Sequence, residues 1–336
     1  MWCPNKPIQN FKKMKRLLSI FCFIIIVSCN DKKDNVRYLS ESSGNINSIS
    51  VVADNILWED KVGEAIRRVL AAPAKGLPQE EPMFSLKQIP TPVFSGFATK
   101  SRIILKIEKT DSTGVSVKEN VYAKPQTVVV VKGKTDQDII NQINENAAKI
   151  IDAFTKREVS EKLRRINKSL LKDEAMENAL GFTIDIPSAY RIAKSEDDFY
   201  WVRKSLTNRM TMDLVFYSYP LDAIRKNDST VVDIITMRDK MLAEGIPGEE
   251  DIIMKTEDAY APSIYEAIID NKKAFETRGV WKIEGAYMGG PFVNYAIEDT
   301  VNNRYLVAEG YVYAPSLDKR EYVFELESII KSIKIK

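Results

Sequence analysis

The sequence predicts an α+β protein built from two mixed sheet-plus-helix domains. Two kinds of pattern support this prediction. Apolar residues recur every three to four positions in several long segments, which is typical of helices with one buried face. Shorter apolar or alternating runs, bounded by Gly, Pro, Asn and Asp, are typical of strands. Because both patterns occur in each half of the chain, we expect each half to form a sheet covered by helices.

The N-terminal domain is expected over residues 48–166, in the order β-α-β-β-β-α. The expected elements are a strand at 48–52, a helix at 56–71, an extended run at 83–89, strands at 102–109 and 121–132 joined by a turn at 111–114, and a helix at 135–165. Pro73 ends the first helix, and an unbroken apolar stripe marks the second. We expect both helices to lie on one face of the sheet.

A charged helical connector is expected over residues 167–180, with Gly181 as its C-cap. The C-terminal α+β domain then covers residues 181–336. Its expected elements are strands at 181–187, 199–204 and 212–219, a helix at 230–244, a meander of strands at 278–287, 292–298 and 304–313, and a helix at 316–330.

The N-terminus has the pattern of a bacterial secretory signal. Residues 12–29 read KKMKRLLSIFCFIIIVSC, in which a basic cluster precedes a largely apolar stretch. This stretch is shorter than the roughly 20 apolar residues that a helix needs to span a bilayer. We therefore predict a cleaved signal peptide rather than a permanent membrane helix, with translation starting at Met1 or at Met14.

The end of this segment, Ile26-Val27-Ser28-Cys29, resembles a lipobox, the cleavage motif of bacterial lipoproteins. The resemblance implies a lipoprotein signal peptide at 1–28 and lipidation of Cys29 by a diacylglycerol and a third acyl chain. Two or more acyl chains anchor a protein stably, so we expect a membrane-tethered mature chain. The polar residues 29–47 are expected to form a flexible tether. Asn30, directly after the Cys, favours the outer membrane, with the protein facing the periplasm or the cell surface.

Composition excludes several function classes. The chain has no His, so Ser-His-Asp and Cys-His catalysis and His-ligated zinc are excluded. Five of the 49 basic residues lie in 1–28, which leaves 44 against 47 acidic residues and no basis for nucleic-acid binding. Two of the three Cys also lie in 1–28 and the third is Cys29, so no disulfide is expected. No Gly-rich phosphate loop is present, and we expect no cofactor, no metal and no identifiable catalytic residue.

One segment has an unusual composition, in which Arg278-Gly-Val-Trp281 precedes Met288-Gly-Gly-Pro-Phe292. Gly289 and Gly290 permit positive φ angles and a close backbone approach. Two interpretations remain open. The glycines can form a turn that directs Trp281 and Phe292 into one core, or they can shape a ligand or partner groove with an aromatic floor. In the second case Arg278 supplies a fixed cation.

The same segments, followed by Glu309-Gly-Tyr-Val-Tyr-Ala-Pro315 and Lys319-Arg320 and preceded by the lipobox, resemble an uncharacterised domain-of-unknown-function family of Bacteroidetes-type lipoproteins. This resemblance implies a tethered envelope protein and supplies no catalytic residues. From 182–187 to 327–332, the pattern is also similar to PsbP-like α/β/α sandwich domains, which are mostly noncatalytic.

Exported proteins of such bacteria are often O-glycosylated at Asp-Ser/Thr followed by an aliphatic residue or Thr. Residues 111–113 and 228–230 fit this pattern. The resemblance therefore implies modification at Ser112 and Ser229, both in expected loops.

These observations favour a noncatalytic, lipid-anchored envelope protein that binds a partner protein or a glycan. The alternative is a glycan-directed hydrolase that uses paired carboxylates, with the acidic groups at 196–198 and 249–251 as candidates. A third hypothesis, a small-ligand carrier, requires an apolar cavity near Trp281 and Phe292.

Overall fold

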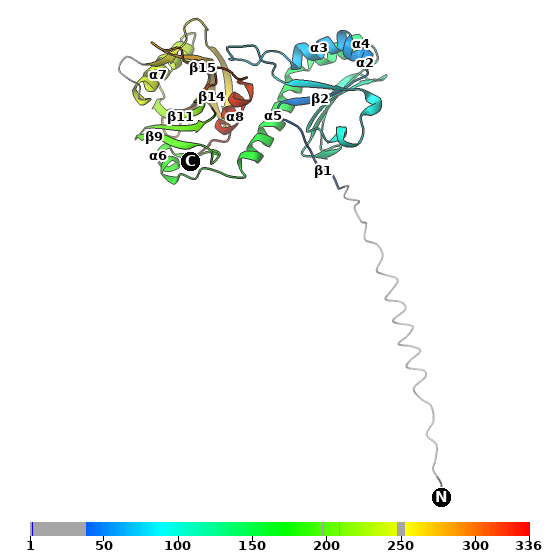
Figure 1. Cartoon of the computed structure of the whole chain (residues 1–336), viewed down its shortest axis with the longest axis horizontal. Coiled ribbons are helices and arrows are strands. Elements are labelled where there is room, and N and C mark those ends of the chain that lie inside the picture. The colour runs from blue at the N-terminus through cyan, green and yellow to red at the C-terminus, as the bar shows by residue number, and fades with distance from the viewer. Residues whose placement is uncertain (1, 3–37, 197, 208, 247–252) are drawn as a thin grey trace. The chain divides into compact units, whose positions relative to one another are not determined.

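The structure is a computed structural model of the 336-residue chain, and it describes residues 2, 38–196, 198–207, 209–246 and 253–336 (Figure 1). Ser40–Lys336 form one compact unit. The predicted signal peptide, Cys29 and most of the predicted tether lie outside the described residues. Within the part of the chain that the structure describes, no helix is long and apolar enough to span a membrane.

The first half contains a five-stranded sheet with the strand order β3-β2-β4-β7-β5. The strands are β2 (Ser48–Val52), β3 (Ser85–Ile89), β4 (Ile103–Lys109), β5 (Gly114–Glu119) and β7 (Thr127–Gly133). Neighbouring strands are parallel except β5, which is antiparallel to β7. The three central strands are almost entirely buried, which explains their nearly continuous runs of Ile and Val.

The predicted direct turn between the strands at 102–109 and 121–132 is wrong. The chain inserts β5 between them, and β4 and β7 run parallel rather than as a hairpin. β5 has the sequence GVSVKE and is half-buried or exposed along its whole length at the sheet edge, so no apolar run marks it. The segment at 121–132 is also interrupted, because β6 (Ala123–Lys124) pairs with β1 (Ser40–Glu41) before β7 begins.

Each predicted helix of the first half is observed as two helices. These are α2 (Asn55–Glu59), α3 (Lys61–Leu70), α4 (Asp136–Glu145) and α5 (Ala147–Ile166). Asp60 is extended, and α3 packs so closely on α2 that a Cβ on Gly63 would lie 1.8 Å from the Trp58 carbonyl oxygen. Asn146 ends α4 by donating from Nδ2 to the Gln142 carbonyl. As predicted, the helices pack on one face of the sheet. Phe94, which follows the 3₁₀ helix η2 (Thr91–Val93), packs on the opposite face. A second 3₁₀ helix, η3 (Gly96–Lys100), follows.

The connector contains α6 (Glu174–Leu180), which ends at Gly181 with φ +69°, as expected for a C-cap glycine. Met176 and Leu180 of α6 are buried in the core of the second half, so the helix belongs to that core rather than spanning a gap.

The second half contains an eight-stranded antiparallel sheet of order β12-β14-β15-β16-β11-β10-β9, with β13 also paired to β14. The strands are β9 (Arg191–Glu196), β10 (Phe199–Ser205), β11 (Thr211–Pro220), β12 (Met254–Thr256), β13 (Ser263–Ile269), β14 (Lys272–Ile283), β15 (Gly289–Asp299) and β16 (Arg304–Tyr313). β9, β12 and β13 were not predicted from the sequence. The predicted strand at 181–187 is reduced to β8 (Phe182–Thr183), which pairs with β17 (Lys334–Ile335).

Helices cover both faces of this second sheet (Figure 1). α6 and α8 (Arg320–Ile330) pack on one face, and α7 (Thr230–Gly245) packs on the other. The last helix begins at Arg320, four residues after the predicted start at 316. The α+β class is confirmed, and the second half has the α/β/α layers expected of a sandwich.

Candidate functional site

A cleft of about 560 Å³ lies where the two halves meet, and we call it the junction cleft. Its walls come from loop 73–77 and helix α5 of the first half and from β13, β14 and α8 of the second. Its main apolar lining residues are Leu77, Met83, Phe84, Ile151 and Phe324. Sites of this size, largely apolar and between substructures, are the usual places where proteins bind ligands or partner segments.

Arg278, the cation predicted for a site, lines this cleft as part of a compensated charge cluster. Its Nε donates to Glu276 Oε1 at 2.5 Å and its Nη2 donates to Glu327 Oε2 at 2.7 Å. Lys331 donates to the other Glu327 oxygen, also at 2.5 Å. Burial raises the pKa of Glu327, but Arg278 and Lys331 outweigh it and hold this pKa at about 2. Arg278 is therefore a fixed structural cation rather than a free one.

The loop that covers Arg278 requires a glycine. Gly76 has φ +77°, and a Cβ there would lie 2.7 Å from the Arg278 Cβ. Beside it, the Lys75 ammonium lies 3.9 Å from the centre of the Tyr265 ring, which is a favourable cation–π contact. This loop of the first half is thus held closely against strands β13 and β14.

Helix α8 is capped by a carboxylate from the other half. Glu81 accepts hydrogen bonds from the backbone N–H groups of Lys319 at 2.7 Å and Arg320 at 2.9 Å. These N–H groups have no partner within the helix, and a negative charge there is favoured by the helix dipole. The Arg320 side chain reaches back to the Pro82 carbonyl at 2.7 Å. The junction is therefore built by specific polar contacts, which fix the walls of the cleft.

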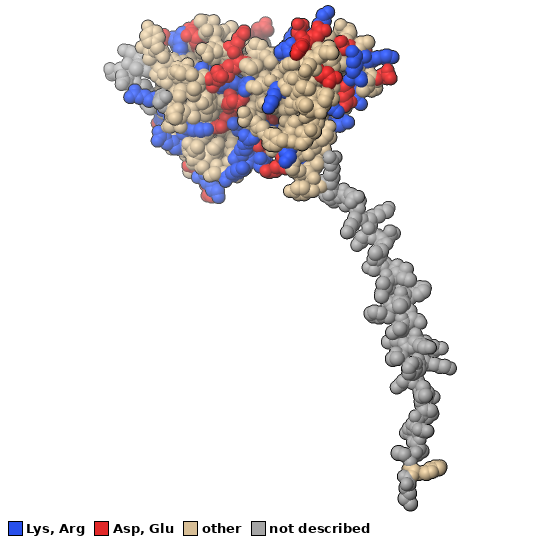
Figure 2. All heavy atoms as spheres, turned by 45° about the vertical axis from the view of Figure 1, so that its right-hand side comes forward, with Lys and Arg blue, Asp and Glu red and all other residues tan. Residues whose placement is uncertain are grey.

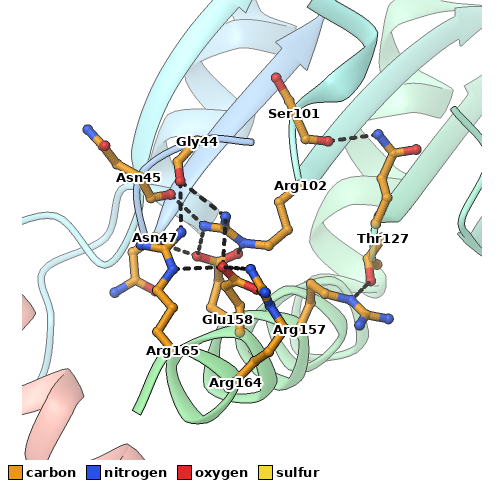
Figure 3. A network of polar contacts seen from close by, with 12 residues as sticks. Gly44, Asn45, Asn47, Ser101, Arg102, Thr127, Arg157, Glu158, Arg164 and Arg165 are labelled. Carbon is orange, nitrogen blue, oxygen red and sulfur yellow. Dashed lines mark hydrogen bonds and ion pairs between the residues drawn. The ribbon is translucent and has the colours of Figure 1, made fainter. Parts of the chain in front are cut away.

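Another wall is held by a buried network around Arg102 and Glu158 (Figure 3). The Asn47 backbone N–H, at the edge of the cleft, donates to Glu158 Oε2 at 2.7 Å. Arg102 donates to both Glu158 oxygens at 2.7 and 2.9 Å and to the carbonyl groups of Gly44 and Asn45. The Arg102 and Glu158 side chains are 2% and 0% exposed. The last residues of the predicted flexible tether are therefore held on α5.

Trp281 and Phe292 lie on the opposite face of the sheet from Arg278. They are 2% and 1% exposed and belong to the core under α7, where the Arg238 guanidinium lies 3.9 Å from the centre of the Phe292 ring. Because alternate residues of a strand point to opposite faces, Arg278 and Trp281 cannot meet. The aromatic pair thus packs in a core, and neither residue lines the junction cleft.

Gly289 and Gly290 lie within β15 rather than in a turn, and neither has a positive φ. The positive φ angles that these glycines permit are therefore not adopted, whereas the close backbone approach is present. A Cβ on Gly290 would lie 2.0 Å from the Val312 carbonyl oxygen, and one on Gly289 would lie 2.6 Å from the Trp281 carbonyl oxygen. The turn itself is made by the preceding residues, with a positive φ at Gly285.

Sequence reasoning missed a second buried ion pair, between Arg238 of α7 and Glu309 of β16. Both side chains are fully buried, and Arg238 Nη2 donates to Glu309 Oε1 at 2.8 Å. Asn294 Nδ2 also donates to Glu309, at 2.9 Å. The sequence carries one signal for this pair, which is the position of its charges. Arg238 interrupts an otherwise apolar helix face, and Glu309 interrupts an otherwise apolar strand. The pair holds α7 against the sheet.

The remaining predicted residues lie apart from the junction cleft. Ser112 is exposed, as an O-glycosylation acceptor must be, whereas Ser229 is half-buried at the N-cap of α7. Glu196, of the first acidic group, lies in β9 and pairs with Lys194 at 3.1 Å. The second group, 249–251, lies outside the described residues. Among the residues that the structure places, no cluster of acidic or Cys side chains could hold a metal. Charges of both signs are interspersed on the face shown in Figure 2.

Two family models together match most of the chain. The model described as domain of unknown function DUF8532 matches residues 42–167, and domain of unknown function DUF4837 matches residues 169–332. The resemblance to an uncharacterised family of domains of unknown function is confirmed, while the Bacteroidetes lipoprotein type stays a prediction. No curated protein matches the chain.

Several solved structures are similar to the chain at low sequence identity. PsbP of Synechocystis sp. PCC 6803 matches with a TM-score of 0.33 and 10% identity, over 49% of this chain and 91% of that chain. The Saccharomyces cerevisiae Ran-binding protein Mog1p matches with a TM-score of 0.31 and 10% identity, over 46% and 90%. LpqN, involved in cell envelope biogenesis of Mycobacterium tuberculosis, matches with a TM-score of 0.27 and 11% identity, over 46% and 83%.

Proposed function

We propose that this chain, which belongs to uncharacterised families through its DUF8532 and DUF4837 domains, is a noncatalytic envelope protein that binds a partner protein in the junction cleft. In this proposal a lipid on Cys29 anchors it to the outer membrane, and the partner is met in the periplasm or at the cell surface. The lipobox-like end of the signal supports the anchor.

The observation that carries the binding proposal is the junction cleft itself, about 560 Å³ and walled by both halves. Its apolar lining suits an apolar side chain or segment of a protein better than a hydroxyl-rich glycan. The Glu81 cap on α8 and the Glu158 contact to Asn47 hold its walls. Because the cleft is already formed before the partner binds, less of the binding free energy is lost to ordering its walls.

The carboxylates of the cleft give the hydrolase alternative little support. A glycosidase of the usual kind needs one carboxyl group that stays protonated near neutral pH to act as the general acid. Glu327 has a pKa of about 2 and is held by Arg278 and Lys331. Glu276 is likewise held by Arg278. A binding role therefore agrees better with the charge arrangement.

In-cell photocrosslinking tests the binding site. A photoreactive amino acid at Leu77, in the cleft, is compared with the same group at Phe97, an exposed aromatic residue of η3 outside the cleft. We expect a discrete crosslinked product to one envelope protein from position 77 and none of that size from position 97. Equal products at both positions, or no product at 77, would contradict binding in the cleft.

The anchor is tested separately with Cys29→Ser in the full chain. We expect the wild-type protein to take up a labelled fatty acid and to sediment with outer membranes, and the variant to do neither. Labelling that persists in Cys29→Ser would refute the assignment of the lipid to this residue.

A further inference from the structure

A second cleft, of about 720 Å³, lies entirely within the second half, and we call it the sheet cleft. It opens on the α7 face of the sheet, beside the start of that helix. Its lining includes Ile268, Phe275 and Tyr305 and the charged residues Lys226, Glu266, Lys273 and Glu298. None of them belongs to the junction cleft, so the two sites are independent.

One buried tyrosine hydroxyl group, that of Tyr305, lies at this cleft without a hydrogen-bond partner of normal geometry among the described residues. Tyr305 is 0% exposed, and the group that lies beside its hydroxyl oxygen is the Lys226 ammonium. Its neighbour across the strand pair, Tyr219, also has a buried hydroxyl group without a partner among the described residues, with ring centres 6.2 Å apart, but it does not line the cleft. Buried tyrosine hydroxyl groups normally have a partner, so the Tyr305 oxygen is available to a polar group that enters the cleft, from a ligand or from water.

The floor of the cleft is apolar and partly aromatic. The ring centres of Phe275 and Tyr305 are 6.4 Å apart, and Ile268 is 66% exposed although it is a large aliphatic residue. These residues share one sheet face, because the strand register places their positions directly or alternately opposite each other. The floor therefore offers an apolar surface beside the buried Tyr305 hydroxyl group.

The rim of the cleft is polar but carries balanced charge. Lys226 Nζ donates to Glu298 Oε1 at 2.8 Å, and Glu266 and Lys273 add one charge of each sign. An ionic ligand would gain little from such a rim. Lys226 is more than half exposed, so its flexible side chain can move aside and open the way to the Tyr305 hydroxyl.

We infer that the sheet cleft binds an uncharged sugar ring of a glycan. The apolar C–H face of the ring would lie on Ile268 and Phe275, and ring hydroxyl groups would bond the rim carboxylates and ammonium groups. One hydroxyl group would give the buried Tyr305 oxygen its partner. This ligand matches an apolar floor, a rim without net charge and an unpaired buried hydroxyl group, all at one place.

The test uses the purified full chain with three named probes, maltotriose, cellotriose and N-acetylglucosamine trimer, each at up to about 10 mM, a range that detects millimolar affinity. Binding is measured by saturation-transfer NMR and titration calorimetry. The variant is Tyr305→Phe, which removes only the unpaired hydroxyl group. The matched control is Tyr260→Phe, at an exposed tyrosine outside both clefts.

We expect at least one trimer to bind and Tyr305→Phe to weaken it roughly tenfold, as the loss of one hydrogen bond does, with Tyr260→Phe unchanged. Thermal unfolding shows whether the Tyr305 variant is folded. Should it unfold, Lys273→Met on the rim replaces it, with a weaker effect in the same direction. Absence of binding by all three trimers, or equal affinity of the folded variants and wild type, overturns the inference. Neither result bears on the partner in the junction cleft.

Discussion

At the scale of residues, the buried Arg102–Glu158 pair contributes to the stability of the protein. Glu158 receives hydrogen bonds from Arg102 and from the Asn47 backbone, and both charged side chains are almost completely buried. Removing Glu158 would leave Arg102 only the more distant Glu161 carboxylate, 3.9 Å away, and a poorly compensated buried charge costs far more than a broken exposed pair. The network therefore stabilises both the first half and the wall of the junction cleft.

We predict that Glu158→Leu lowers the free energy of unfolding by about 3–5 kcal/mol. The double variant Arg102→Leu/Glu158→Leu should recover part of this loss, because no unpaired charge remains. Urea denaturation measures both. The control is Lys156→Met, which removes an exposed pair with Asp152 and should cost less than about 0.5 kcal/mol. Equal losses of unfolding free energy in Glu158→Leu and Lys156→Met would show that the buried pair contributes no more to stability than an exposed pair.

Glu327 gives a prediction of pH dependence. Its pKa of about 2 lies below its ordinary value of 4.5, because Arg278 and Lys331 outweigh the effect of burial. A carboxyl group with a lowered pKa contributes stability above the unfolded pKa and loses it as pH falls through the folded pKa. We expect this contribution, on the order of 3 kcal/mol, to be lost between about pH 4.5 and pH 2.

Glu327→Gln isolates this contribution. The variant should be less stable than wild type at pH 7, and its stability should fall less steeply below pH 4.5. Denaturation curves at a series of pH values measure the difference. Parallel pH profiles for the two proteins would contradict the assigned role of Glu327.

At the scale of elements, α8 depends on a residue that is distant in the sequence. Its first turn has no side-chain cap of its own, and Glu81 of the other half accepts from Lys319 and Arg320 instead. A cap of this kind couples the stability of the helix to the docking of the two halves.

We predict that Glu81→Ala costs about 1–2 kcal/mol, the usual cost of losing an N-cap. Glu81→Gln should cost less, since an amide oxygen still accepts a hydrogen bond but lacks the charge. Hydrogen exchange of the Lys319 and Arg320 amides reports on the cap locally. Unchanged protection of these amides in Glu81→Ala would be inconsistent with the proposed cap.

The elements also show what the sequence could predict. Helix 230–244 and the last strands were found because their apolar residues recur with a clear period. The break at Asn146 was missed because the apolar stripe of α4 continues into α5, while the break is set by a local hydrogen bond from Asn146. β5 and β13 were missed because they lie at sheet edges, where half-exposed strands carry mixed residues.

At the scale of the whole molecule, the apolar patterns predicted the fold class and the N-terminal signal predicted the address, but the junction cleft could not be predicted. Its parts, such as Gly76 and Arg278 or Glu81 and Lys319, are about 200 residues or more apart in the sequence. Only the folded chain brings them together. The composition of the segment at 278–292 is unusual, but its aromatic residues and glycines mainly pack in the core under α7.

The central claim is that the junction cleft binds a partner protein, and the affinity of the purified chain for the protein crosslinked from position 77 tests it most directly. The account predicts that Leu77→Asp, which places a charge on the apolar lining, weakens binding at least tenfold while the protein remains folded. Phe97→Asp, outside the cleft, should leave the affinity unchanged. Equal affinity of wild type and folded Leu77→Asp would contradict the claim.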